Sequence, residues 1–261
     1  MIVNFNLTHI STATMLLEIG KLRILTDPVF DPAGGRYSFG WGTGSTKLTN
    51  SPVSTEALGQ IDAVLLSHDH HEDNLDKAGR AFLPKAKRVL TTTSGERRLR
   101  GNAEGLANWQ STILESGDTK VKVSATPAQH GPLFVRPFAG QTIGFILEWE
   151  GQQNGALYIT GDTIFYHGIQ EVAERFTVSV GIFHLGRASF PITGPIRFTM
   201  DAKDGVKAAR VLNPRTLIPI HYEGWKHFRE GRSVIEKEFT AAGLSEKLRW
   251  LEMGKNVEIE I

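Results

Sequence analysis

The stretch from Val64 to Asn74 constrains the structure of this chain more than any other. A short aliphatic run, Val64 to Leu66, is followed within seven residues by three histidines and three acidic residues. The run predicts a buried strand, because it is short, apolar and preceded by a polar turn. Side chains alternate along a strand, so we expect His68 and His70 to point the same way and to bind one divalent cation. The alternative is a polar loop after a strand, which we would accept for either histidine alone.

Composition limits the kind of site that this stretch can form. The chain has 261 residues, of which 40% are hydrophobic and 22% charged, as in a globular protein with a substantial core. It has no cysteine, so a metal must be held by His, Asp and Glu. The net charge of +1 does not favour nucleic acid or an acidic membrane surface as a partner. We expect a cytoplasmic protein with a single domain, 1–261, because neither a signal peptide nor a membrane-spanning run is recognisable.

Further apolar runs also end in groups that bind metals, and each such run predicts a strand. These groups are His130 after residues 120–127, Asp162 after 156–160 and His221 after 216–220. Strand ends join rigid backbone to loops, which suits them to holding ligands in a defined geometry. Together the groups predict a site for zinc, or else manganese or iron. Asp162 is the best candidate to bridge two cations, which at a separation of about 3.5–4 Å can hold a nucleophilic hydroxide.

Asp27 and two long loops are further candidates. Asp27 ends the apolar run Leu22–Leu25, and it either supports a metal-binding histidine or forms a turn before Pro28. Residues 28–53 are expected to form a loop with interleaved aromatic residues, including Phe39 and Trp41, which either lines a substrate cleft or packs its own aromatics at the surface. Three arginines on this loop and on the loop 186–198 are candidate ligands of an anionic substrate: Arg36, Arg187 and Arg197.

The remaining local patterns predict several short elements. We expect a helix from Ser54 to Leu58 and a strand from Leu248 to Glu252. Thr93 opens a capping-box match, and Thr199 is the expected N-cap of a helix from 200 to 212.

Four motifs, in this order along the chain, resemble the metallo-β-lactamase superfamily: Ser67-His68-Asp69-His70, Gln129-His130-Gly131, Thr160-Gly161-Asp162-Thr163 and Pro219-Ile220-His221-Tyr222. Residues near His9 and Asp27 are similar to its branch containing L-ascorbate-6-phosphate lactonase and N-acyl-phosphatidylethanolamine-hydrolysing phospholipase D. The resemblance extends from about residue 7 to residue 225. It implies a four-layer αββα sandwich of the α/β class, with metals at one edge between two sheets.

The resemblance also implies roles for the ligands. His68, His70 and His130 would bind one metal, Asp162 would bridge, and His221 would help to hold a second. The superfamily motif H-x-H-x-D-H does not fit exactly, however. One alignment keeps His68 and His70 and uses Asp73 for the second metal. The other treats the loop as one residue longer and brings in His71 with Asp73.

We prefer the first alignment, because Ser67-His68 fits the preceding strand. Asp73 takes part in both alignments. The final histidine of the motif is missing, so the protein would bind one or two divalent metal ions, preferably zinc. Asp27, His71, His184 and Tyr222 are expected near the ligands.

The expected activity is hydrolysis of an ester, lactone or phosphodiester bond in a small molecule, anionic if the arginines bind it. A metal-bound hydroxide would attack, and Asp73 or Asp162 would orient the water and accept its proton. One alternative is a phosphodiesterase or nuclease of the same fold, guided by the basic residues between Lys85 and Arg100. Another is a non-catalytic binding protein with a degraded second metal site. The sequence predicts neither the oligomeric state nor the substrate.

Overall fold

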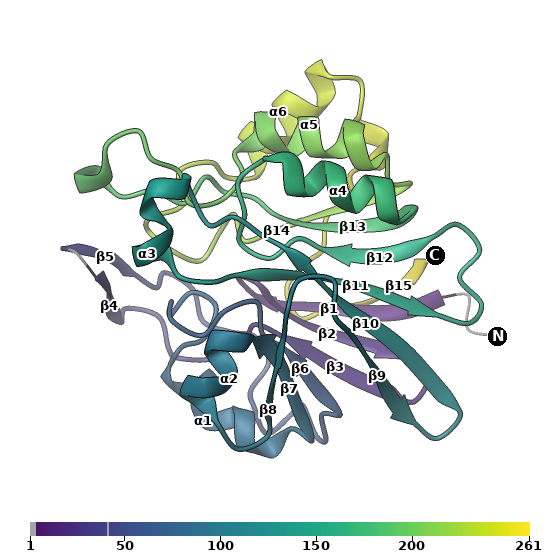
Figure 1. The fold of residues 1–261 in the computed structure, drawn as a ribbon. Coiled ribbons are helices and arrows are strands. Elements are labelled where there is room, and N and C mark those ends of the chain that lie inside the picture. The colour runs from purple at the N-terminus through teal and green to yellow at the C-terminus, as the bar shows by residue number, and fades with distance from the viewer. Residues whose placement is uncertain (1–3, 41) are drawn as a thin grey trace.

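Two β-sheets pack face to face, and helices cover their outer faces (Figure 1). The computed structural model describes residues 4–40 and 42–261. Helices α4, α5 and α6 lie on the second sheet, and α1 and α2 lie outside the first (Figure 1). This arrangement confirms the predicted αββα sandwich. Among the described residues, no helix combines the length and apolar character needed to cross a bilayer.

The first sheet is antiparallel at one edge and parallel at the other. In spatial order its strands are β15 (Asn256–Glu260), β1 (Asn4–Ser11), β2 (Thr14–Ile19), β3 (Leu22–Thr26), β6 (Ala63–Leu65), β7 (Arg88–Thr92) and β8 (Ala103–Leu106). The second sheet is parallel from β12 to β14 and antiparallel elsewhere. Its order is β14 (Thr216–Ile220), β13 (Val178–His184), β12 (Ala156–Ile159), β11 (Ile143–Trp149), β10 (Thr119–Pro127) and β9 (Ser111–Ser116).

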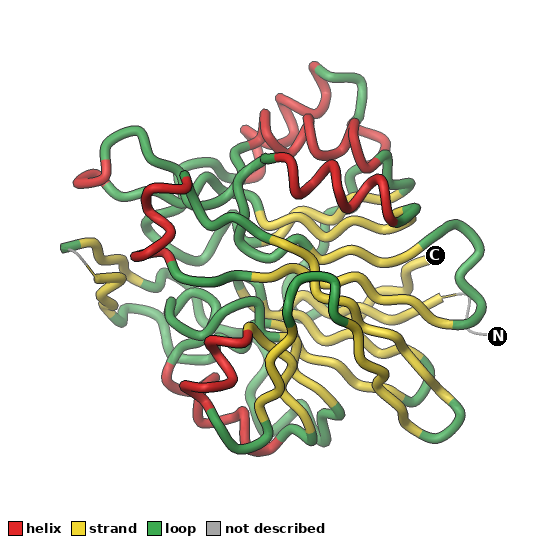
Figure 2. The backbone as a smooth tube through the Cα atoms, viewed as in Figure 1, coloured by secondary structure: helices red, strands yellow, loops and turns green. Residues whose placement is uncertain are grey.

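The helices are short and follow the strands that they cover (Figure 2). They are α1 (Lys77–Phe82), α2 (Thr93–Leu99), α3 (Arg136–Ala139), α4 (His167–Arg175), α5 (Ala202–Leu212) and α6 (Arg232–Ala241). Four 3-10 turns complete the helical segments: η1 (Leu83–Lys85), η2 (Leu133–Val135), η3 (Pro191–Thr193) and η4 (Ser245–Lys247).

Strand alternation divides the core into three clusters. On β2, Met15 and Leu17 join the cluster between the sheets, whereas Leu16 joins the cluster under α1. On β13, Ile182 lies between the sheets and Phe183 packs under the helices of the other outer layer. Both faces of these strands are therefore apolar, as expected for sheets in the middle of a four-layer sandwich.

Several local predictions were wrong. The expected loop 28–53 contains a two-stranded hairpin, β4 (Arg36–Gly40) and β5 (Thr43–Thr46). Trp41 lies outside the described residues, as do Met1, Ile2 and Val3. Residues 55–58 form a turn rather than a helix, and residues 248–252 contain only an isolated bridge at Leu248.

The predicted helix caps were displaced by one or two residues. Asp201 rather than Thr199 caps α5, and its side chain accepts the N–H of Asp204. Thr92 rather than Thr93 caps α2 and accepts the N–H of Gly95. In both cases the capping oxygen lies three residues before the N–H that it accepts, which is the usual capping geometry.

Candidate metal centre

The loops that carry the predicted ligands meet at one edge of the sandwich. β12, β13 and β14 are parallel, and β10 has the same direction because the antiparallel β11 separates it from β12. Their carboxyl ends therefore deliver His130, Asp162 and His221 to the same edge. His68, from the facing sheet, joins them: His68, His130 and Asp162 offer ligand atoms within 4.8 Å of one another.

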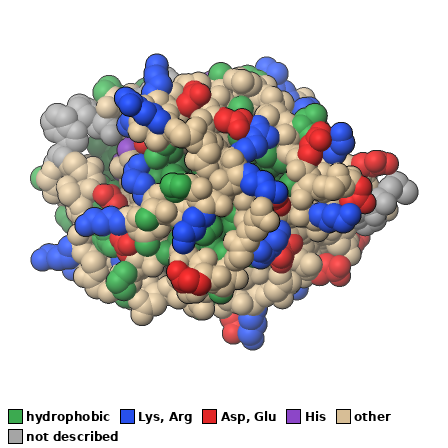
Figure 3. Space-filling view, turned by 90° about the horizontal axis from the view of Figure 1, so that it is seen from below, with side chains coloured by type: hydrophobic (Ala, Val, Ile, Leu, Met, Phe, Trp, Pro, Cys, Tyr) green, Lys and Arg blue, Asp and Glu red, His purple; other side chains and the backbone are tan. Residues whose placement is uncertain are grey.

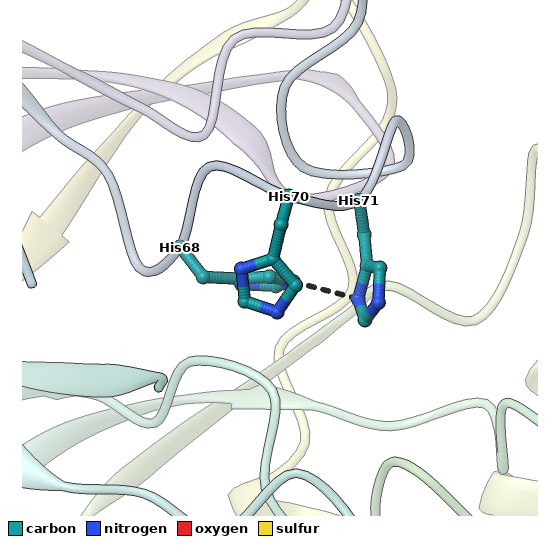
Figure 4. A group of neighbouring side chains, drawn as sticks. All are labelled: His68, His70 and His71. Atoms are coloured by element: carbon teal, nitrogen blue, oxygen red, sulfur yellow. Dashed lines mark hydrogen bonds between the residues drawn. The ribbon is translucent and has the colours of Figure 1, made fainter. Parts of the chain in front are cut away.

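The loop after β6 carries His68, His70 and His71, and their rings lie close together (Figure 4). β6 ends at Leu65, so His68 and His70 lie on a loop, and strand alternation does not explain their proximity. Instead, the loop folds back so that the rings of His68 and His70 lie 4.8 Å apart between centroids, and those of His70 and His71 4.4 Å apart.

Hydrogen bonds fix which ring nitrogens of His68 and His130 are free. Ser67 Oγ donates to Asp27 Oδ1 at 2.8 Å, so it accepts from Nδ1 of His68 at 2.9 Å. The carbonyl of Phe198 can only accept, so Nδ1 of His130 donates to it at 2.8 Å. Each ring therefore keeps a lone pair on Nε2, which is the form in which imidazole binds metals.

His71 brings these two lone pairs together. Its Nδ1 lies 3.2 Å from Nε2 of His68 and 2.9 Å from Nε2 of His130. One N–H cannot serve two acceptors well, whereas a cation accepts lone pairs from all three rings. Burial, reinforced by the neighbouring rings, lowers the pKa of His68 and His71 well below the ordinary value and that of His130 to about 4. All three rings are therefore neutral at pH 7.

His70 differs from His71 in its surroundings. Its Nε2 donates to the carbonyl of Ala139, and its buried Nδ1 has no hydrogen-bond partner among the described residues. It offers a ligand atom close to those of His68 and His71, but His71 is the one that also reaches His130. The geometry therefore favours the longer-loop alignment, which includes His71, over the one that we preferred from sequence.

A second group consists of Asp73, Asp162 and His221. Nε2 of His221 lies 3.4 Å from Asp73 Oδ2 and 3.5 Å from Asp162 Oδ1. Burial opposes a charge on His221, but Asp162 and Asp73 outweigh it and raise the pKa of this imidazole to about 9. Burial raises the pKa of Asp162. Two buried carboxylates at this spacing require a positive charge between them.

The orphaned oxygens of these aspartates fit a metal. Both carboxylate oxygens of Asp162, and Oδ1 of Asp73, are buried without a hydrogen-bond partner among the described residues. Leaving such groups unpaired costs several kcal/mol in most proteins (about 1–3 kcal/mol for each atom). A donor set of imidazole nitrogens and carboxylate oxygens suits a divalent cation such as zinc, manganese or iron.

The backbone at these strand ends is strained or glycine-dependent. Gly161, before Asp162, has φ +60, and a Cβ there would lie 2.4 Å from the carbonyl oxygen of Ile143. Asp27 and His221 adopt φ values of 31° and 61°, which residues other than glycine rarely adopt. Such strain persists only where the surrounding structure imposes it, and it is common at functional sites.

Asp27 supports His68 through Ser67, which agrees with one of the two interpretations of Asp27 from the sequence. Its Oδ1 accepts from the N–H and the hydroxyl of Ser67, both at 2.8 Å, and Ser67 in turn contacts His68. Burial raises the pKa of Asp27 to about 7, although the bonds from Ser67 oppose this shift. His184 also lies below the site, with its Nε2 3.8 Å from Asp27 Oδ2.

Two further groups lie near the second cluster, and neither had a defined role in the sequence prediction. Nε2 of His227 lies 3.0 Å from Asp73 Oδ2, and its Nδ1 lies 2.7 Å from Ser45 Oγ on the hairpin. In the longer-loop alignment Asn74 stands where the superfamily motif has its final histidine, and its Oδ1 lies 3.3 Å from Nε2 of His221. His227 follows no apolar run, so the strand-end pattern could not have identified it.

Four of the predicted residues lie away from the two clusters. Tyr222 packs against Trp250 under the outer helices, because it points to the opposite side of the chain from His221. The three arginines also lie elsewhere. Arg197 pairs with Asp201 and Asp204, Nε of Arg187 lies 3.9 Å from Glu230, and Arg36 is exposed on β4.

The β4–β5 hairpin covers the site and is anchored by a buried ion pair. Nζ of Lys47 lies 3.2 Å from Asp76 Oδ2, and both side chains are fully buried. The ring of Phe39 on the hairpin is tilted against those of His71 and His227, with ring centroids 5.5 and 5.0 Å away. A pocket of about 220 Å³ lies beside this ring and reaches His71, Asp73 and His130.

Solved structures of other proteins have a similar fold. A family model described as the beta-lactamase superfamily domain matches residues 22–222. The structure of an isothiocyanate hydrolase from Delia radicum gut bacteria matches with a TM-score of 0.83 and 21% identity, covering 98% of this chain and 100% of that one. Igni18, a metallo hydrolase from Ignicoccus hospitalis, matches with a TM-score of 0.73 and 20% identity, covering 99% of both chains. The fold and the family model together define a protein of the metallo-β-lactamase superfamily.

Sequence relatives narrow this assignment. A UPF0173 metal-dependent hydrolase from Carboxydothermus hydrogenoformans is 36% identical over 249 residues, which cover 93% of this chain and 95% of the relative. Another, from Methanopyrus kandleri, is 24% identical over 260 residues, covering 97% and 99%. The chain belongs to the UPF0173 metal-dependent hydrolase family. These relatives carry neither the lactonase nor the phospholipase D name, so that narrower branch stays a prediction.

Proposed function

We propose that this protein binds one or two divalent cations at the two clusters and hydrolyses an ester, lactone or phosphodiester bond there. The observation that carries the proposal is Asp162, a fully buried carboxylate near His68 and His221 whose two oxygens have no hydrogen-bond partner among the described residues. In the proposed ligand set, His68, His71 and His130 hold the first cation, with His70 as the alternative to His71. Asp162 lies between the two positions, and Asp73 with His221 holds the second.

A cation at such a site lowers the pKa of water and polarises the bond to be cleaved. The protein's own groups then orient the reactants. Asp162 would keep one oxygen for the cations and accept the proton of the attacking water on the other, whereas Oδ2 of Asp73 already contacts His227. The water oxygen bonds to the carbonyl carbon or phosphorus, the bond to the leaving group breaks, and Asp162 returns the proton to the leaving oxygen.

The structure gives less support to a polymer substrate. Three of the basic residues between Lys85 and Arg100 are paired with carboxylates on the same surface: Lys87 with Asp62, Arg88 with Glu104 and Arg98 with Asp69. Seen from the side of α1 and α2, basic and acidic side chains are intermixed rather than gathered by sign (Figure 3). Nucleic-acid binding needs a continuous basic surface, so we rank hydrolysis of a small molecule first.

The test is a substrate panel measured with and without metal. The panel holds an aryl ester, a lactone, a bis-aryl phosphodiester and, because of the fold match, an aryl isothiocyanate. We expect a chelator to abolish turnover of at least one member and one of Zn²⁺, Mn²⁺ or Fe²⁺ to restore it. Turnover that survives complete removal of metal would refute the proposal, and metal binding without any turnover would favour the binding-protein alternative.

A further inference from the structure

We infer that the substrate is uncharged and places a bulky apolar group in the pocket beside His71 and His130; this inference rests on the proposed function and specifies its substrate class. The pocket has a volume of about 220 Å³, below the usual range of roughly 300–1,000 Å³ for sites that enclose a whole small molecule, so it fits one apolar group of a substrate. Its wall is mainly aliphatic and aromatic, and its largest apolar members are Phe39, Val135, Phe190, Ile196 and Phe198.

The aromatic wall is continuous with the imidazoles. The ring of Phe39 lies 5.5 Å from that of His71 and 5.4 Å from that of Phe190. Phe198 lies 5.8 Å from both Phe190 and His130. An apolar group seated against these rings therefore holds the adjoining bond next to the ligand histidines. Positioning of this kind is what a substrate pocket contributes to the rate.

The charges near the pocket argue against an anionic substrate. Among the described residues that line it, none is a lysine or arginine, and its one carboxylate is Asp73. Arg36 lies in a separate hollow with Lys226 and Arg229, on the other side of the wall formed by Phe190 and His227. An anion placed against the phenyl rings would lose its hydration without gaining a cationic side chain.

The first experiment compares two esters of similar length in the metal-loaded protein: ethyl 3-phenylpropanoate, which is neutral, and monoethyl adipate, which is anionic. We expect kcat/KM to be about 100-fold higher for the neutral ester. Within a neutral series of ethyl alkanoates, each added methylene should raise kcat/KM about fourfold until the pocket is full. Equal rates, or a preference for the anionic ester, would overturn the inference while leaving the proposed hydrolysis intact.

A matched pair of variants tests the wall itself. Ile196→Lys puts a cation into the pocket, and we expect it to lower kcat/KM for the neutral ester at least tenfold and to reduce the preference for it. Ile192→Lys is the control: Ile192 lies in the same loop, is 68% exposed and does not line the pocket. Equal effects of the two variants would count against the pocket as the binding site.

A binding measurement distinguishes failure of this inference from failure of the proposed function. The probes are 3-phenylpropanamide and the monoamide of adipic acid, and the readout is ligand-observed NMR on the wild-type protein and on Ile196→Lys. We expect the neutral amide to bind the wild type and to be weakened at least tenfold in the variant. Such binding without turnover of any ester, lactone or phosphodiester would refute the proposed function alone. No binding of the neutral amide, or tighter binding of the anionic one, would refute the inference.

Discussion

The two sheets supply the candidate metal centre in different ways. The second sheet contributes one group from each of several strand ends, at His130, Asp162 and His221. The first sheet contributes a single loop, residues 66–74, which holds more histidines and acidic residues than the two cation positions need. A strand end is positioned by its neighbours in the sheet, but a loop is positioned by side-chain hydrogen bonds such as those of Ser67. The two sources of ligands should therefore respond differently to mutation.

The largest effect is expected at a strand end, for Asp162→Asn. This change removes a buried charge whose two oxygens have no hydrogen-bond partner among the described residues and whose Oδ1 lies 3.5 Å from Nε2 of His221. We expect kcat/KM to fall about 10²–10⁴-fold, because the group both binds the cations and moves the proton. The control is Asp69→Asn: Asp69 is also buried, but Arg98 holds its carboxylate, with Nε 2.8 Å from Oδ2. Elemental analysis should show metal lost from the Asp162 variant and kept in the control.

The next effect separates the neighbouring histidines of the loop. Because Nδ1 of His71 lies near both His68 and His130, His71→Gln should weaken metal affinity about 100-fold. His70→Gln is the matched change, and it should cost less than about tenfold, since His71 and not His70 is the histidine that contacts Nε2 of His130. Competition with a chromogenic chelator measures both affinities. A larger loss of metal affinity in His70→Gln than in His71→Gln would favour the alignment that we preferred from sequence.

A smaller effect is expected at the support of the loop. Asp27→Asn keeps the shape of the side chain but removes the charge that accepts from Ser67, which orients His68. We expect metal affinity to fall about 10-fold, at the lower end of the range for such supporting groups. Ser67→Ala should have a similar effect, and the double variant should be little worse than either single one. Fully additive losses would mean that the two residues do not act through the same contact.

The last expected effect is on stability rather than metal binding, and it concerns a buried histidine outside the site. Burial lowers the pKa of His9 to about 4, against an ordinary value of 6.5, and its Nε2 donates to the carbonyl of Thr12 at 3.1 Å. The unfolded chain therefore binds more protons between these values, so this group makes the protein less stable as the pH falls from 6.5 to 4. From pH 7 to pH 5 the loss should be about 2 kcal/mol.

The check is the free energy of unfolding of the wild type and of His9→Gln, measured by urea at both pH values. Glutamine can keep the donor to Thr12 but does not titrate, so the variant should lose about 2 kcal/mol less than the wild type over this range. Equal losses in the two proteins would show that His9 titrates normally in the folded state.

The same contrast between sheets explains what could be predicted from sequence. The placement of His130, Asp162 and His221 at strand ends followed from apolar runs that end in polar groups, whereas the four-layer sandwich followed from the resemblance and was confirmed by the fold. The choice between His70 and His71 depends on where β6 ends and on the contact of His71 with His130, which lies 59 residues further along the chain. No local pattern carries that information.

The pocket was even harder to predict from the sequence than the choice between His70 and His71. Phe39, Phe190 and Phe198 come from a hairpin and a loop that meet only in the folded chain, and the hairpin itself was expected to be a loop. Arginines on the same segments suggested an anionic substrate, but Arg197 proved to be paired with Asp201 and Asp204. Charge in a sequence indicates a ligand only once its own partners in the fold are known.

The most direct test of the account is anomalous X-ray scattering from crystals of the metal-loaded protein, recorded at the absorption edge of the bound element. We predict a peak within bonding distance of His68, His71 and His130, and a second peak, if both positions are filled, on the far side of Asp162 next to Asp73 and His221. No peak between these side chains, at full metal loading in solution, would contradict the claim that the two sheets were brought together around a cation.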